Sequence, residues 1–281
     1  MILHGSVIEV AYNVQAAVDN KHKLIVHYDT TNVNDRKALF PIAMEVRRIC
    51  CKETLAALAD KGYHNGEQLQ RCMMHDIVTF VAFQDIPRSN PVPTPEYFGE
   101  RFIYHPKEDQ YTCPAGNKMS STGKWYTKKY RKTASTQVKH YKTSACKNCP
   151  VRINCTNNPN GRIIERSENA EAVEANNQRL NQQKELYQLR QQLCEHPFGT
   201  IKRQWGYDHI LLKGIKKNNG EFGIIFLIYN FVRVLNILGI SEFKKRLGRC
   251  FYHFLTIWRA IPPNTFNIYL SSYKPSWCAI H

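Results

Sequence analysis

One stretch in the C-terminal half combines residues that could act on a polyanion: Arg190, Glu195 and Lys202. Its upstream flank, residues 170–193, is rich in helix formers. At 3.6 residues per turn, Glu195 and Lys202 lie two turns apart and point the same way, so an acid and a base could address one bound ligand. Pro197 predicts a kink or a helix boundary beside Glu195. From the pattern alone, a solvated face of a surface helix is the alternative.

A second carboxylate, Asp60, follows the short apolar run Thr54–Ala59 and precedes the loop that contains Gly62. A buried strand that ends in a carboxylate is typical of the edge at which α/β sheets place their chemistry. An aspartate at a strand end is otherwise a turn former or a helix cap, and this alternative stays open.

These residue types suit metal-assisted phosphodiester cleavage. Two divalent cations about 4 Å apart activate the attacking oxygen and stabilise the leaving one. Carboxylates are the hard oxygen ligands that Mg²⁺ prefers, and Mn²⁺ accepts the same ligands. Asp60 and Glu195 could supply two of the three carboxylates of such a site. Arg190 and Lys202 would neutralise phosphates near the scissile bond.

Four cysteines suggest a second metal. Cys113, Cys146, Cys149 and Cys155 stand within one polar segment, and one Cys-x-x-Cys pair with two flanking cysteines can bind zinc tetrahedrally. We expect the metal to replace a core that this segment cannot build. Free reduced thiols are the alternative, and His140 is a rival ligand.

The charge of the chain indicates nucleic acid as a partner. The net charge is +16, and the sequence between Asp109 and Glu165 holds eleven Lys or Arg and no acid. Such stretches suit a phosphate backbone, where counterion release drives binding. A solvated loop and an acidic membrane surface are the alternatives. Aromatic residues interleave with the basic ones: Trp125, Tyr126, Tyr130 and Tyr141.

Hydrophobic patterning predicts an α/β fold ahead of this basic segment. Alternating apolar runs separated by a polar turn predict a hairpin, and apolar positions at helical spacing predict the helices. A segment with four prolines, residues 87–95, ends the pattern. The expected order is a hairpin (10–18 and 24–28), a helix (37–51), a strand (54–59), a helix (67–74) and a strand (77–83).

Both candidate carboxylates stand in longer motifs. These are Tyr12-Asn-Val-Gln-Ala-Ala-Val-Asp19, Asp60-Lys-Gly-Tyr63, Glu195-His-Pro-Phe-Gly-Thr-Ile-Lys202, Lys213-Gly214, Glu221 and Tyr229-Asn-Phe-Val-Arg233. Together they resemble the signatures of DDE transposases of bacterial insertion sequences. The resemblance implies that Asp60 is the second catalytic aspartate, that Glu195 is the third metal-binding carboxylate, and that Lys202 contacts DNA near the cut. Tyr187 and Arg190 resemble the tyrosine and arginine that precede this glutamate, with one residue more before it.

The resemblance also implies a ribonuclease-H-like fold, a mixed sheet with flanking helices that is interrupted by the cysteine-containing basic insertion. In this fold the first catalytic aspartate lies on the central strand, upstream of the hairpin. Only Met1 to Glu9 precede the hairpin, without an aspartate, while Asp19 and Asp35 stand later. We therefore expect the first strand to be missing, and the hairpin to lack the strand that joins it to the Asp60 strand.

The resulting hypothesis is a DNA transposase that cuts and joins insertion-sequence ends by a two-metal mechanism, in a truncated form with poor turnover. It would be a decayed gene fragment or one half of a split product, with a homodimer or a complementing N-terminal fragment as partner. The alternative is a non-catalytic, zinc-stabilised DNA-binding protein. The expected domains are 10–86 and 166–240 for the catalytic core, 87–165 for the insertion and 241–281 for an unassigned basic tail.

The expected compartment is the cytoplasm. Met1-Ile-Leu-His-Gly-Ser lacks the basic start and long apolar core of a signal peptide, and ten cysteines without an export signal favour thiols and metal over disulfides. The longest apolar run, Phe222 to Ile240, contains Asn230 and Arg233, which are costly in hydrocarbon. We therefore expect a buried amphipathic helix there, packed through Phe222, Ile225, Phe226, Tyr229, Val232 and Leu235, and no membrane.

Overall fold

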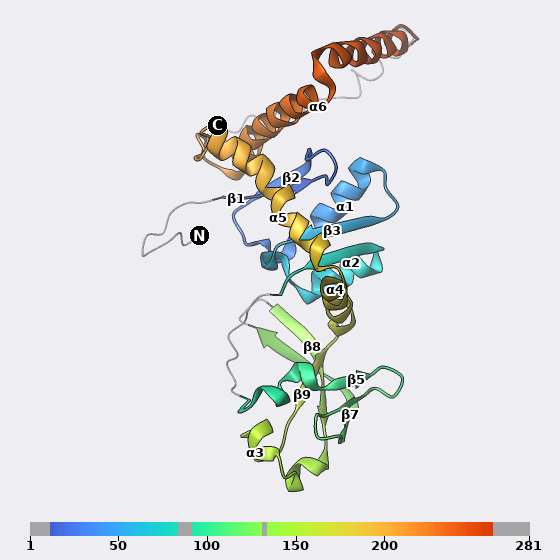
Figure 1. The fold of residues 1–281 in the computed structure, drawn as a ribbon, viewed down its shortest axis with the longest axis vertical. Coiled ribbons are helices and arrows are strands. Elements are labelled where there is room, and N and C mark those ends of the chain that lie inside the picture. The colour runs from blue at the N-terminus through green and yellow to red at the C-terminus, as the bar shows by residue number, and fades with distance from the viewer. Residues whose placement is uncertain (1–11, 84–91, 131–133, 261–281) are drawn as a thin grey trace, which may run out of the picture. The chain divides into compact units, whose positions relative to one another are not determined.

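The computed structural model describes residues 12–83, 92–130 and 134–260 (Figure 1). Helices and strands mix along the chain, and the described strands form three sheets. The chain divides into two compact units. The first unit runs to Ala17 and from Val26 to Gln192, and the second comprises Val18–Ile25 and the chain from Leu193.

The predicted hairpin is confirmed as β1 (Asn13–Val18) and β2 (Ile25–Thr31). Its turn is organised by the carboxylate of Asp19, which accepts hydrogen bonds from three backbone N–H groups. An aspartate that binds the backbone a few residues on is a common way to fix such a turn. The Asp19 carboxylate therefore has a structural role.

The next four predicted elements are also confirmed: α1 (Leu39–Cys50), β3 (Leu55–Ala59), α2 (Gly66–Met74) and β4 (Ile77–Val81). β3 and β4 pair in parallel, and α2 provides the crossover connection that a parallel pair needs. The core beside them is apolar and includes Leu39, Phe40, Ala43, Leu69, Cys72, Ile77, Val81 and Ala172.

Within the described residues, the hairpin and the β3–β4 pair remain separate two-stranded sheets. The sheet that a ribonuclease-H-like fold requires would join them through a further strand. That fold therefore stays a prediction, whereas the mixed α/β class is confirmed.

The basic insertion forms a five-stranded antiparallel sheet in chain order. Its strands are β5 (Ile103–His105), β6 (Gln110–Thr112), β7 (Lys118–Tyr130), β8 (Ala134–Lys142) and β9 (Ile164–Ser167). The short helix α3 (Arg152–Cys155) lies in the connection between β8 and β9. The expectation that this segment cannot build a core is wrong. The sheet buries Phe102, Tyr111, Met119, Tyr141 and Ile164 together, because a few large aromatic side chains bury enough apolar area for a small sheet.

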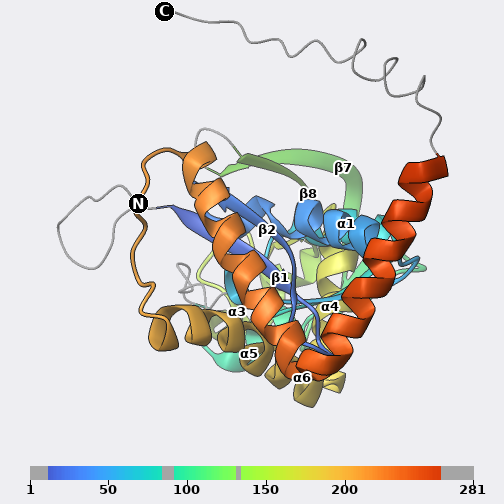
Figure 2. The same cartoon turned by 90° about the horizontal axis from the view of Figure 1, so that it is seen from above.

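Helices dominate the rest of the described chain: α4 (Ala170–Gln182), α5 (Lys184–Gly199), a π-helix (Thr200–Gln204) and α6 (Ile215–Ala260). α5 continues through Pro197, so the predicted helix boundary beside Glu195 is wrong. α6 is interrupted at Gly239, whose φ of 74° is outside the helical region. Figure 2 shows α6 as two straight segments with different directions.

The predicted apolar face of α6 is buried in part. Phe226 and Tyr229 are buried, and Val232 is 38% exposed. The other three predicted positions are half-buried: Phe222, Ile225 and Leu235. The stretch Ile215–His253 is long and apolar enough to cross a membrane, and 11% of its most apolar part is buried. The expectation of a buried helix is therefore wrong for most of this stretch. One helix of this kind is weak evidence that the chain spans a membrane. The expectation that it does not stays a prediction.

Candidate functional site

The first unit brings Asp60, Tyr187 and Arg190 together, and we call these three residues the Asp60 cluster. Asp60 follows β3 directly, and its Oδ1 accepts a hydrogen bond of 2.7 Å from the backbone N–H of Lys61. An Nη2 atom of Arg190 lies 3.8 Å from the same Oδ1. The hydroxyl group of Tyr187 donates to the carbonyl oxygen of Ala59 at 3.3 Å. Two predicted DNA contacts thus lie beside a predicted metal ligand.

The guanidinium of Arg190 is not fully hydrogen-bonded by the residues around it. It lies 5.5 Å from the ring centroid of Tyr187, and its Nε is buried without a hydrogen-bond partner in the described chain. Its distance to Asp60 exceeds that of a direct charge-assisted hydrogen bond, which is about 2.7–2.9 Å. Asp60 also acts as the N-cap of the short 3₁₀-helix Lys61–Tyr63, so the structural alternative for this residue is realised as well.

A further carboxylate, Asp35, lies next to this loop. A Cβ atom at Gly62 would lie 3.1 Å from Oδ2 of Asp35, so a larger residue at position 62 would crowd the carboxylate. Side-chain amides of Asn13 and Gln15 donate to Oδ1 of Asp35, the latter at 3.0 Å. The sequence alone does not assign a role to Asp35. The signal was the alternation Asn-Val-Gln in β1, which places both amides on one face of the strand.

Glu195 and Lys202 belong to the second unit. Glu195 lies in α5, whereas Lys202 lies in the π-helix and is exposed. A π-helix has a wider turn than an α-helix, so the α-helical phase that predicted a common direction for these two side chains ends at Gly199. Single π-turns are frequent at functional sites.

The C-terminal motif residues of the second unit hold the hairpin turn. The side-chain amide of Asn230 accepts from the N–H of Ile25 and donates to its C=O, both at 2.8 Å. Tyr229 donates to the carbonyl of Lys23, and Nε of Arg233 donates to the carbonyl of His22, both at 2.9 Å. These side chains satisfy backbone groups that the turn leaves unpaired.

The second unit also contains a polar pocket of about 180 Å³, which the sequence did not reveal. Nδ1 of His196 lies 2.9 Å from the hydroxyl oxygen of Tyr229. Burial lowers the pKa of His196, and the positive charges of Lys23 and Arg233 lower it further, so this imidazole is neutral at pH 7. The pocket is lined by His196, Thr200, Gln204, Trp205, Tyr229, Val232, Arg233 and Asn236.

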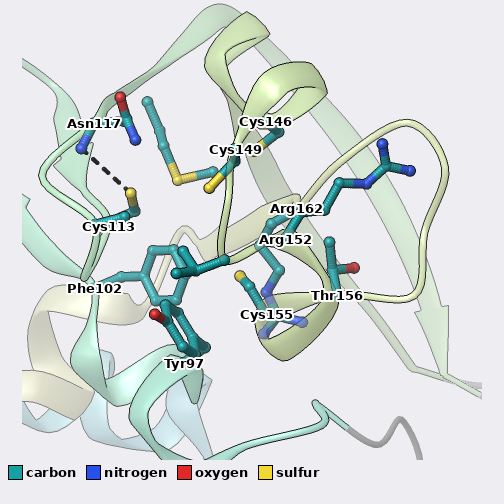
Figure 3. A pocket seen from close by; sticks show the side chains of 13 residues that line it. Tyr97, Phe102, Cys113, Asn117, Cys146, Cys149, Arg152, Cys155, Thr156 and Arg162 are labelled. Carbon is teal, nitrogen blue, oxygen red and sulfur yellow. Dashed lines mark hydrogen bonds between the residues drawn. The ribbon is translucent and has the colours of Figure 1, made fainter.

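All four predicted zinc ligands line one small pocket of the insertion (Figure 3). Burial raises the pKa of the Cys155 thiol, and the positive charge of Arg162 opposes this shift. The nearby thiols raise this pKa further: Cys146, Cys113 and Cys149. The backbone N–H of Asn117 donates to Sγ of Cys113 at 3.3 Å. The rival ligand His140 instead stacks on Tyr126, with ring centroids 4.5 Å apart.

The donor set fits zinc in chemistry but is not assembled as a coordination site. In the described part of the chain, no three His, Cys, Asp or Glu side chains are arranged so that they could hold a metal ion. The nine cysteines of that part are free thiols. The four thiols therefore line one pocket but lie too far apart to bind one metal ion as they stand. Binding of zinc would have to bring them closer together.

Residues 112–235 match a family model described as a transposase DDE domain. The match confirms the resemblance to DDE transposases, and it contains Glu195, Tyr187, Arg190, Lys202 and the four cysteines, while Asp60 lies upstream of it. No curated protein and no solved structure matches the chain.

Proposed function

We propose that this protein is a DNA transposase that cleaves phosphodiester bonds and transfers strands at the ends of an insertion sequence. The match of residues 112–235 to a transposase DDE domain carries this proposal. The Asp60 cluster supports it, because Arg190 lies within 3.8 Å of a carboxylate at a strand end, where α/β proteins place their chemistry.

The proposal needs Mg²⁺ or Mn²⁺, which would activate the attacking oxygen and stabilise the leaving oxygen. Asp60 and Glu195 would hold the metal, and Asp35 is the third carboxylate that we propose, because it lies beside Gly62 and is oriented by Gln15. Arg190 would donate to a non-bridging phosphate oxygen, with Tyr187 limiting the freedom of its side chain. Lys202 would bind the DNA backbone.

The test is nicking of supercoiled DNA by the purified chain with Mg²⁺ or Mn²⁺. Asp60→Asn, Glu195→Gln and Asp35→Asn should each abolish nicking, because each removes a negatively charged metal ligand. Glu53→Gln and Asp208→Asn are matched controls at exposed positions and should leave it unchanged. Nicking that persists in the Asp60 and Glu195 variants would refute the metal site.

A non-catalytic, zinc-stabilised DNA-binding protein is the second candidate function. The convergence of Cys113, Cys146, Cys149 and Cys155 on one pocket favours it. Zinc analysis of the purified chain should find one zinc ion per chain, lost in Cys149→Ser and kept in the exposed control Cys50→Ser. DNA binding with zinc but without nicking would identify this form, and nicking that returns when an N-terminal fragment is added would identify a split transposase.

The cytoplasm is the location that we propose, because its reducing conditions keep thiols available for zinc. A homodimer is a further proposal, and the mass of the purified chain in solution tests it.

A further inference from the structure

β7 and β8 extend farther than the strands β6 and β9 that pair with their outer edges. β6 pairs only with Lys118–Ser120 of β7, and β9 pairs only with Val138–Tyr141 of β8. Farther along, the two strands pair with each other, from Trp125 opposite Lys139 to Tyr130 opposite Ala134. Figure 2 shows the long β7 and β8 strands. We call residues 124–130 and 134–139 the β7–β8 ribbon.

The described part of the ribbon is basic and contains no acidic residue. Lys128 pairs with Glu165, and Lys139 pairs with Asp109 at 2.9 Å. Lys124 and Lys129 are exposed and have no acidic partner in the described part of the chain. These two ammonium groups are therefore the uncompensated charges of the ribbon.

Two large aromatic rings are exposed on the ribbon next to these charges. Trp125 is 49% and Tyr126 43% exposed, and as neighbours in a strand they lie on opposite faces. Nζ of Lys139 lies 5.0 Å from the Trp125 ring, and Tyr126 stacks on His140 with an angle of 9° between the rings. Both rings are thus held in position while one side stays open to a partner.

We infer that the β7–β8 ribbon docks in a groove of double-stranded DNA, with Lys124 and Lys129 on phosphates and Trp125 against the groove wall. A major groove about 12 Å wide admits a two-stranded β-ribbon. Uncompensated lysines release counterions from the phosphate backbone, which supplies affinity without reading sequence. The inference rests on the proposed function and adds a surface separate from Arg190 and Lys202.

The test is the salt dependence of binding to a labelled DNA duplex, measured by fluorescence anisotropy. The double variant Lys124→Gln/Lys129→Gln should lower the slope of log K against log salt by about 1.8, because each lost phosphate contact contributes about 0.9. The control Lys52→Gln/Lys107→Gln removes the same charge from exposed lysines elsewhere in the first unit, and its slope should equal that of the unmodified chain. Circular dichroism verifies that both variants are folded.

A second measurement needs no variant. Acetylation of the unmodified chain with and without duplex DNA should show protection of Lys124 and Lys129 but not of Lys52. Equal slopes for the ribbon variant and the unmodified chain, or equal acetylation of Lys124 with and without DNA, would overturn the ribbon assignment and leave the proposed function intact. Failure of the unmodified chain to bind duplex DNA would overturn both the ribbon assignment and the proposed function. Tighter binding of the unmodified chain to vesicles of anionic lipid than to duplex DNA would do the same.

Discussion

Arg190 holds an Nη2 atom 3.8 Å from Oδ1 of Asp60, and its own Nε is buried without a partner in the described chain. A direct ion pair would be shorter and would use more of the guanidinium donors. The Asp60 side chain is 57% exposed, so the two charges stabilise the fold by at most about 1 kcal/mol. The pair is better suited to bind a third, anionic group than to stabilise the protein.

Replacement of this arginine should therefore affect DNA cleavage more than stability. We expect Arg190→Gln to lower kcat for nicking on the order of 10²-fold, the typical cost of removing one preorganised donor. Its midpoint in urea should shift little. Arg48→Gln is the control, because Arg48 is an exposed arginine that pairs with Glu45. A large loss of stability with unchanged nicking would mean that Arg190 is a structural residue.

Gly161 should be needed for the cysteine pocket. Its φ is +87°, and a Cβ atom at this position would lie 2.5 Å from Cβ of Cys146. Gly161→Ala should destabilise the insertion by about 1–3 kcal/mol through backbone strain, and should lower the zinc content by displacing Cys146. Thermal unfolding and zinc analysis measure the two effects. Gly99→Ala is the control, since nothing lies within 4 Å of its Cβ position, and equal behaviour of the two variants would contradict the prediction.

Asn230 should stabilise the second unit through Ile25. Asn230→Ala leaves the N–H and C=O of Ile25, a residue only 7% exposed, without their side-chain partner. We expect a loss of about 1–3 kcal/mol in the free energy of unfolding, measured in urea. Asn236→Ala, on an exposed position of the same helix, should cost less than about 0.5 kcal/mol. Equal losses would show that the amide of Asn230 contributes nothing specific.

Asp109 should make the stability of the insertion depend on pH in the acid range. Hydrogen bonds, first from Lys139 and then from Tyr141, lower its pKa from 3.8 to about 2. Because the folded pKa is depressed, the stabilisation is fully present above pH 3.8 and is lost as the pH falls through about 2. The difference in unfolding free energy between the unmodified chain and Asp109→Asn should therefore shrink from pH 5 to pH 2. A constant difference would exclude this carboxylate as the cause.

The early elements and the candidate residues could be predicted from local sequence patterns. The hairpin, α1, β3, α2 and β4 follow from hydrophobic periods of 2 and 3.6, which neighbouring residues encode. The motifs around Asp60 and Glu195 likewise stand in contiguous stretches, and the match of residues 112–235 agrees with the second of them.

The contacts between residues distant in sequence became visible in the folded chain. Folding placed Arg190 beside Asp60, set Asp35 against Gly62, and gave Asn230 its role at Ile25, and none of these pairs is close enough in sequence for a local pattern to predict it. It also gave the basic insertion an aromatic core around Tyr141 that its polar composition concealed. Periodicity fixes which face of an element is apolar, whereas the packing of whole elements fixes which faces come together.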